Sequence, residues 1–303
     1  MRSHLTVHES EIQIGGRLAR IARLAHEEYE VLRDPELVID GLRRSGIRID
    51  LFTFIQPLSD TTPKYTYPME WDNLAVLPVS TFEEWFKHQI RFAPRGRVRQ
   101  AEKKGVTVRE LPFDDALIKG IWGIYNESPV CQGKRSRHYG SDIQTVRRKE
   151  ATFPDRSVFV GAFLAGEMIG FLRMVLDYER KEARLIEFMS MVRHRDKCAA
   201  NALIAQGIRS CADRGVSFLI YEKFAYGKKT DGLLQFKDVN GFKRVDIPRY
   251  YVPLTPFGSF ALRVGLHRSL ADHLPVSLAD SIRQARSTWY SWRFRHVVED
   301  LRS

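Results

Sequence analysis

Three strand-like segments follow one another in the middle of the chain with no helix between them. They cover residues 157–164, 167–177 and 183–192, and only Ala165-Gly166 and a charged turn, DYERKE, separate them. Such short connections join antiparallel neighbours, because a parallel pair needs a crossover of a dozen or more residues. Other periodic elements flank this meander: strand 106–111, helices within 113–127 and 139–152, the helix after Lys197, strand 217–223, helix 231–239 and strands within 242–254. This order predicts a mixed α/β fold with a central mixed sheet flanked by helices, and it excludes a plain doubly wound sheet.

The first hundred residues predict an N-terminal α/β extension. Helical spacing of apolar side chains predicts a helix over residues 17–33, and alternation predicts strands over 47–56 and 73–79. The apolar side chains of the helix are Leu18, Ile21, Ala25, Tyr29 and Leu32.

A further helix is expected after Ser80 or Thr81, either of which can cap it. It should run towards Lys104 with a kink or break at Pro94 or Gly96. Residues 87–104 contain seven Lys or Arg residues and one Glu. This basic stretch is either a solvated helix face or a surface for phosphate groups.

The composition favours an anionic partner. The chain has 303 residues and a net charge of +11, which suits a nucleotide, a nucleic acid or an acidic membrane surface. No run of 18 apolar residues predicts a spanning helix, and the N-terminal residues lack the apolar core of a signal peptide. Three cysteines without a pairing motif fit the cytoplasm, and no His/Cys spacing predicts a metal site.

Basic residues crowd the start of the helix that follows the meander. Arg193, His194, Arg195 and Lys197 surround Asp196 where strand 183–192 gives way to that helix. Cations are unfavourable at the positive end of a helix macrodipole. The cluster is therefore either a solvated loop or a site for an anion held by free backbone N–H groups.

Three segments in this order carry a resemblance to the GCN5-related N-acetyltransferase (GNAT) superfamily. VFVGAFLAGEMIGFLRMV resembles the second and third strands of that fold, and LLQFKDVNGFKRVDIPRYYVPL resembles its closing segment. Between them, residues 195–200 (RDKCAA) are similar to the acyl-coenzyme A loop, Arg/Gln-x-x-Gly-x-Gly/Ala. The resemblance covers residues 105–255 and implies a GNAT acyl-CoA acyltransferase fold.

The resemblance implies a site for acetyl-CoA or another acyl-CoA at the loop. Backbone N–H groups and basic side chains would hold the diphosphate, and an N–H near Met191 or Val192 would meet the oxyanion. The implied donor-binding residues are Met191, Val192, Arg193, Arg195, Asp196, Lys197, Cys198, Ala199 and Ala200. Cys198 departs from the motif, which has glycine at this position for close backbone approach.

The resemblance also implies catalytic roles. Glu187 stands on the strand that supplies the general base in this family, although a salt bridge to Arg173 or Arg184 would equally account for it. The tyrosine that commonly serves as general acid is replaced by Lys237. Tyr221 and Tyr226 are the candidates to take over its role.

A polar loop, residues 124–142, falls where the resemblance places acceptor-binding segments. It is richer in functional side chains than a connector requires. The candidate substrate-binding residues are Glu127, Gln132, Arg135, Arg137, His138 and Tyr139.

The segment RVRQAEKKGVTVRE resembles the basic segment before the core strand in Fem-type aminoacyltransferases, which take amino acids from aminoacyl-tRNA. The first hundred residues would then be a partial GNAT-like unit, and tRNA a partner. The tail predicts a basic amphipathic helix that packs on the protein or a second copy, or lies on an anionic membrane. Its apolar face comprises Leu278, Ile282, Ala285, Trp289, Trp292 and His296.

These observations predict three regions: the extension 1–104, the GNAT-like domain 105–255 and the tail 256–303. The expected function is transfer of an acetyl or other acyl group from a coenzyme A thioester to a small-molecule or peptide amine. The alternatives are a Fem-like aminoacyltransferase and a non-catalytic GNAT-fold binding module.

Overall fold

The computed structural model describes residues 3–27, 29–32, 34–131, 134–225 and 232–268, together with residues 285, 288–290 and 292–293. The chain divides into two compact units. Unit 1 comprises residues 1–75, 223–229 and 244–274, and unit 2 comprises residues 76–222, 230–243 and 275–303. This division differs from the expected boundaries at 104 and 255, because residues 76–104 cluster with unit 2 and the closing strand clusters with unit 1. Within the described residues, no helix combines the length and apolar character needed to cross a membrane.

Unit 1 contains a mixed sheet in the order β1, β2, β3, β4, β13, β5. Its elements are β1 (Ser3–Val7), β2 (Ser10–Gly15), β3 (Ile21–Leu24), α1 (Pro35–Arg44), β4 (Leu51–Ile55), β5 (Met69–Pro78), β13 (Lys243–Pro253) and α8 (Pro256–Arg263). β3 pairs with β4 in parallel, whereas β4 pairs with β13 in antiparallel orientation. The sheet therefore inserts a strand from the end of the chain beside a strand from its beginning.

The predicted helix over residues 17–33 is wrong, because this segment contains β3. Ala22 and Leu24 are buried while Arg23 is exposed, and Leu18, which should have faced the core, is 70% exposed. Pairing with β2 and β4 supplies the backbone hydrogen bonds of β3. Short apolar segments fit helical and strand periodicities equally well, and tertiary pairing decides between them. The helix of this region is α1, capped by the Asp34 carboxylate on the N–H of Leu37.

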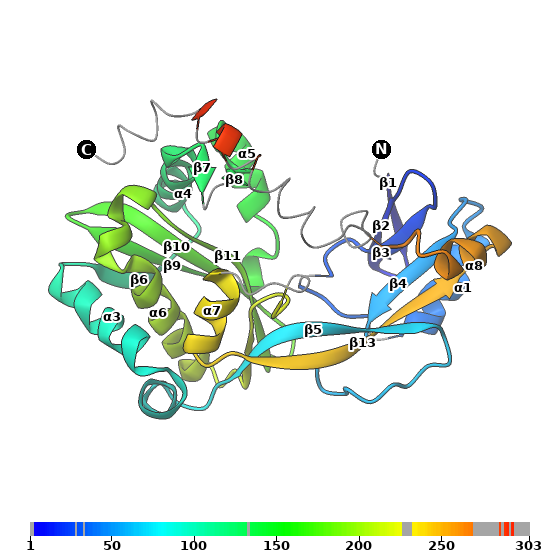
Figure 1. The fold of residues 1–303 in the computed structure, drawn as a ribbon, viewed down its shortest axis with the longest axis horizontal. Coiled ribbons are helices and arrows are strands. Elements are labelled where there is room, and N and C mark those ends of the chain that lie inside the picture. The colour runs from blue at the N-terminus through cyan, green and yellow to red at the C-terminus, as the bar shows by residue number, and fades with distance from the viewer. Residues whose placement is uncertain are drawn as a thin grey trace. The chain divides into compact units, whose positions relative to one another are not determined.

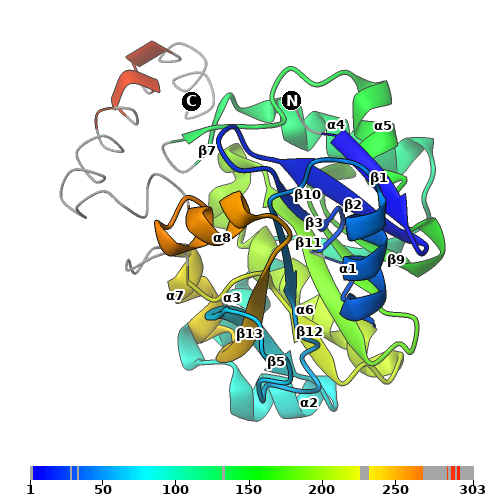
Figure 2. The same ribbon diagram turned by 90° about the vertical axis from the view of Figure 1, so that its right-hand side faces the viewer.

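Helices cover both faces of the unit 1 sheet. α1 lies beside β1 (Figure 2) and packs its buried face into a core that includes Phe52 and Phe54. On the other face, Leu51 packs with Ala261 of α8. Gly258 of α8 lies against the backbone of Asp50, where an added Cβ would come within 1.8 Å of the carbonyl oxygen, so only glycine fits there.

Unit 2 contains the predicted meander. Its sheet runs from the end of β5 through β12 (Phe218–Ile220), β11 (Glu182–Ser190), β10 (Glu167–Leu176) and β9 (Ser157–Leu164) to β6 (Thr107–Leu111). β9, β10 and β11 are successive antiparallel neighbours, and β11 pairs in parallel with β12. Ala165 and Gly166 both have positive φ, as a tight two-residue hairpin requires. The mixed α/β architecture predicted from the sequence is confirmed.

The helices of unit 2 lie on both sides of this sheet (Figure 1). They are α3 (Phe92–Lys103), α4 (Asp115–Glu127), α5 (Ile143–Glu150), α6 (Ala199–Asp213) and α7 (Gly232–Val239). Leu172 of β10 faces α6, where it lies against Gly207. Phe171 faces the opposite side and meets Tyr125 of α4 edge-on, with ring centroids 5.7 Å apart. Phe171 and Arg173 of β10 therefore face α4 and α5, which is where the polar site lies.

The helix expected after Ser80 or Thr81 begins at α2 (Phe82–Glu84), and the Thr81 hydroxyl accepts the N–H of Glu84 and caps it as predicted. α2 continues into a π-helical turn, η1 (Trp85–Gln89). The break then falls at Ile90 and Arg91, ahead of the expected Pro94. Proline is tolerated in the first turn of a helix, so Pro94 sits inside α3 without breaking it.

Candidate functional site

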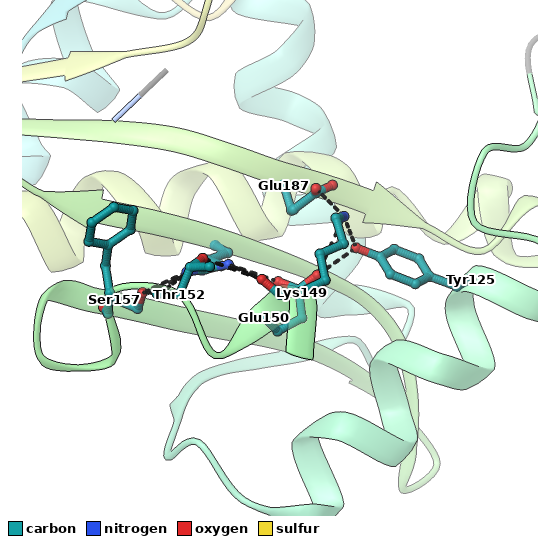
Figure 3. Close-up of polar contacts among 8 residues, drawn as sticks. Tyr125, Lys149, Glu150, Thr152, Ser157 and Glu187 are labelled. Atoms are coloured by element: carbon teal, nitrogen blue, oxygen red, sulfur yellow. Dashed lines mark hydrogen bonds and ion pairs between the residues drawn. The ribbon is translucent and has the colours of Figure 1, made fainter. Parts of the chain in front are cut away.

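Glu187 lies at the solvent-facing end of a polar network on the α4–α5 side of the unit 2 sheet. Its carboxylate bonds to the ammonium of Lys149 on α5, and this ammonium also donates to the phenolic oxygen of Tyr125 on α4, at 2.8 Å (Figure 3). The Tyr125 hydroxyl in turn donates to the carboxylate of Glu150, at 2.9 Å. Three elements that are distant in sequence thus converge on one chain of hydrogen bonds.

The deep end of the network is a buried ion pair. Glu150 and Arg173 are 0% and 1% exposed, and the guanidinium lies 3.2 Å from the carboxylate. Arg173 also donates to the hydroxyls of Thr152 and Ser157, at 2.9 and 3.1 Å. Each charge is paired and hydrogen-bonded, as burial of an ion requires.

The carboxylate of Glu187 pairs with Lys149 and with neither of the two arginines considered from the sequence. Arg173 lies directly opposite Glu187 in the β10–β11 register, but its guanidinium points to Glu150. Arg184 pairs with Glu182, at 3.2 Å. The Glu187 side chain is 15% exposed and that of Lys149 36%, so this end of the network is open to solvent.

Tyr125 and His138 form the wall beside Lys149. Their rings are stacked with centroids 4.2 Å apart. Burial, together with the carboxylates of Glu187 and Glu150, raises the pKa of the Tyr125 phenol far above its usual value. Burial and the charges of Lys149 and Arg137 lower the pKa of His138 to about 4. Both rings are therefore neutral at neutral pH, and His138 can accept a proton or a hydrogen bond at its free nitrogen.

A second part of the candidate site is the turn η3 (Val192–Lys197), which follows β11. The Glu127 carboxylate, at the end of α4, accepts the backbone N–H groups of Val192 and Arg193, at 3.0 and 2.8 Å. The N–H of Met191 donates to the carbonyl of Ile169 on β10, at 2.8 Å. The N–H groups expected to meet an oxyanion are thus bonded within the protein in this conformation.

Most charges of the turn are paired with each other or with nearby acids. Arg193 pairs with Glu167, and Lys197 pairs with Asp196 at 3.0 Å. Lys104, at the end of α3, donates to the carbonyl of Asp196 at 2.6 Å. Arg195 is exposed.

Cys198 occupies the glycine position of the resemblance in a left-handed conformation, with φ of 60°. Glycine adopts left-handed backbone without steric cost, whereas a residue with a side chain is strained there. Ala199 and Ala200 follow as the first residues of α6. The thiol of Cys198 lies 3.4 Å from the side-chain oxygen of Gln100 on α3.

Of the two tyrosines proposed as acids, the structure describes Tyr221, which packs away from the Glu187 network. Tyr221 is buried beyond β12 and meets Phe188, so it lies on the face of β11 opposite to Glu187. Burial raises the pKa of Tyr221. The Nζ of Lys237, which is itself fully buried, lies 4.4 Å from the Tyr221 ring centroid. Tyr226 lies outside the described residues.

The candidate acceptor-binding residues separate into two groups. Glu127 and His138 lie at the site. Glu127 accepts hydrogen bonds from the backbone of the η3 turn, and the His138 ring stacks on Tyr125. Arg135, Arg137 and Tyr139 are exposed: Arg135 ends the short strand β8 (Lys134–Arg135), which pairs with β7 (Val130–Cys131), and the other two follow it. Gln132 lies outside the described residues. Within the described part of the chain, no group of three or more His, Cys, Asp or Glu residues could hold a metal ion.

Sequence reasoning missed Tyr125, Lys149 and Glu150 as site residues. Tyr125 and Lys149 come from two helices that precede the meander, and nothing in their spacing indicates that their side chains meet. Glu150 is the last residue of α5, after three basic residues, and reads as part of a solvated end. Arg173 carried a usable signal, because an arginine inside an apolar strand requires a buried partner.

Comparison with known proteins identifies the fold of this chain. No protein-family model matches the sequence, and no curated protein matches it significantly. Solved structures are similar over most of both chains. The structure of L-PGS from Bacillus licheniformis has 11% identity and a TM-score of 0.57, with 87% of this chain and 88% of that one covered.

Two further solved structures are also similar over most of both chains. The C-terminal domain of a protein assigned as a lysylphosphatidylglycerol synthetase from Agrobacterium fabrum has 14% identity and a TM-score of 0.55, with 86% of each chain covered. FemX has 10% identity and a TM-score of 0.51, with 82% of this chain and 87% of that chain covered. The chain has a GNAT-like fold close to the Fem type, as the resemblance predicts.

Proposed function

We propose that the protein is an acyltransferase that moves an aminoacyl group from aminoacyl-tRNA to an amine acceptor. The position of Glu187 is the observation that supports the proposed reaction. Glu187 is a partly exposed carboxylate on the strand where the resemblance expects the base, and Lys149 fixes its orientation. The donor is favoured by the fold, because the likeness to FemX and to the L-PGS structure extends over more than four fifths of each chain.

The chemistry requires a proton acceptor beside the amine. The amine nitrogen attacks the acyl carbon, a C–N bond forms, and the ester C–O bond to the ribose breaks. Glu187 takes the proton that the amine loses and returns it, directly or through water, to the leaving ribose oxygen, so the carboxylate is ionised again for the next turnover. Lys149 and Tyr125 hold the base in place, and Arg173 holds Tyr125 through Glu150.

The first test is the donor assay. Purified protein is supplied with labelled aminoacyl-tRNA or labelled acetyl-CoA and a panel of amines, and the labelled amide is measured. We expect label transfer from tRNA, and a fall of about 10²–10⁴-fold in turnover for Glu187→Gln with the fold retained. Glu182→Gln, on the same strand, is the matched control and should keep activity. Full activity of Glu187→Gln would remove the proposed base.

An acyl-CoA donor is the second candidate, and the backbone of the turn favours it. Cys198, at the glycine position of the motif, has a left-handed conformation immediately before α6, which glycine adopts without steric cost. Arg195, Lys197 and the first N–H groups of α6 are the groups that would hold the diphosphate. Turnover of acetyl-CoA without tRNA would establish this donor. Absence of turnover with both donors would favour the binding-module alternative.

A further inference from the structure

The basic stretch, residues 87–104, combines cations that contact the rest of the protein with cations that are exposed. Three of its cations make contacts within the protein: Arg91 pairs with Asp238, Lys104 bonds to Asp196, and Arg95 donates to the carbonyls of Lys87 and Ile90. Arg97, Arg99 and Lys103 are exposed on α3. We call these three residues and Phe92 the α3 face; at 3.6 residues per turn, Phe92, Arg99 and Lys103 lie on one side of the helix, and Arg97 lies to the side of them.

Phe92 is the aromatic residue of this face. It is the first residue of α3 and is 89% exposed, the largest value among the large apolar side chains of the described residues. In the sequence, Arg91 precedes it, and Arg95, Arg97 and Arg99 follow it. An exposed ring on a helix that also carries exposed cations offers a flat apolar surface near positive charge.

Arginine and aromatic groups also alternate beside this face. Arg95 and Arg99 lie over the ring of Phe86, with guanidinium carbons 5.8 and 5.5 Å from its centroid. Phe86 is stacked on Phe82 at 5.5 Å, and Arg209 of α6 covers the Phe82 ring at 4.1 Å. Stacking orients a guanidinium while leaving its edge N–H groups able to bind phosphate.

The segment that carries this surface is hydrogen-bonded to the rest of unit 2, and its end at Lys104 bonds to the η3 turn of the candidate site. The indole of buried Trp85 donates to the carbonyl of Asn240, and the N–H of Arg91 donates to that of Val239, both at 2.9 Å. α3 packs against α6 (Figure 1). At its end, Lys104 bonds to Asp196 of the η3 turn. A ligand bound along α3, which is about 18 Å long, would therefore extend to the η3 turn at the Lys104 end of the helix.

We propose that the α3 face binds an unpaired RNA strand. Phe92 stacks on a base, and Arg97, Arg99 and Lys103 contact the backbone phosphates. This inference rests on the proposed function, and the strand would be the unpaired end of the RNA that carries the aminoacyl group. A duplex would satisfy the cations but not Phe92, because paired bases are stacked on each other.

The experiment measures fluorescence anisotropy of a labelled 12-nucleotide uridine RNA and of a 12-base-pair RNA duplex at several salt concentrations. We expect the full chain to prefer the single strand. Phe92→Ala should weaken single-strand binding about 5- to 100-fold with no change in salt slope, and Phe92→Trp should restore it. The triple variant Arg97→Gln, Arg99→Gln, Lys103→Gln should lower the slope by about 2.

Phe260→Ala is the matched control, since Phe260 is an exposed phenylalanine of unit 1. Equal losses in Phe92→Ala and Phe260→Ala, or equal affinity for strand and duplex, would overturn the proposal. So would Phe92-dependent binding to phosphatidylglycerol vesicles in place of RNA. Strand binding through Phe92 without aminoacyl transfer would refute the proposed function alone, whereas transfer that is unaffected by Phe92→Ala would refute this inference alone.

Discussion

The Glu187 network and the α3 face both concentrate charge in unit 2, but they do so in opposite ways. In the network, Glu150 and Arg173 are buried and every charge has fixed partners. On the α3 face, Arg97, Arg99 and Lys103 are exposed. Charges in the first arrangement should govern stability and the geometry of the site, whereas charges in the second should govern binding and leave folding unaffected. Substitutions in the two regions can separate these roles.

The largest effect is expected for Arg173→Met. It leaves the Glu150 carboxylate buried without its counter-ion, and such losses cost about 3–5 kcal/mol. Urea denaturation of the wild type and the variant measures the difference in the free energy of unfolding. Arg173→Met combined with Glu150→Gln should recover part of the loss, because the buried charge is then removed. A loss below about 1 kcal/mol for the single variant would show that this pair is not a structural element of the network.

An intermediate effect is expected at His138, on the rim of the network. Its pKa is lowered from 6.5 to about 4 in the folded protein, so the unfolded chain binds a proton first as the pH falls. Stability is therefore lost as the pH falls from about 6.5 towards 4, by about 1–2 kcal/mol at pH 5. His138→Phe keeps a stacked ring that cannot titrate. Denaturation at pH 7 and pH 5 should show a smaller loss for this variant, and equal losses would place the titration elsewhere.

A smaller effect is expected at Cys198, which contacts Gln100 of α3. Its left-handed backbone is strained for a residue with a side chain, so Cys198→Gly should raise the free energy of unfolding by about 0.5–1 kcal/mol. Thermal and urea denaturation measure the change. Cys211→Gly is the control with the opposite sign, because Cys211 is buried inside α6. Destabilisation by Cys198→Gly would mean that the thiol contact outweighs the backbone strain.

The smallest effect on stability is expected on the α3 face. The triple change of Arg97, Arg99 and Lys103 to Gln should alter the free energy of unfolding by less than about 0.5 kcal/mol, because these side chains are exposed. The measurement is the same urea denaturation. A loss above 1 kcal/mol would show that these cations stabilise the fold, and the contrast between the two regions would then fail.

The sequence predicted unit 2 better than unit 1, for a physical reason. β9, β10 and β11 are long apolar runs separated by short turns, and their neighbours in sequence are their neighbours in the sheet. β3 has four residues, and its neighbours β2 and β4 supply the contacts that make it a strand. No local pattern contains that information.

The same distinction applies to the candidate site. Glu187 stood out because a carboxylate inside an apolar strand requires an explanation. Its partner Lys149 comes from α5, 38 residues earlier, in a helix whose basic residues read as solvated. Sequence can therefore nominate single side chains by the cost of burying them, whereas the partners that complete a network depend on how the helices pack.

The position of β13 has a consequence for the order of events during synthesis. β13 lies between β4 and β5, and its Arg249 pairs with Ile55, about two thirds of the chain length away in sequence. When the first hundred residues leave the ribosome, the sheet of unit 1 lacks this strand, so β4 has an open edge until residue 253 has emerged. Unit 1 is thus the first part to be made, but its sheet is completed only after every strand of unit 2 has been made, and a chaperone that shields its unpaired edge would have most of translation in which to act.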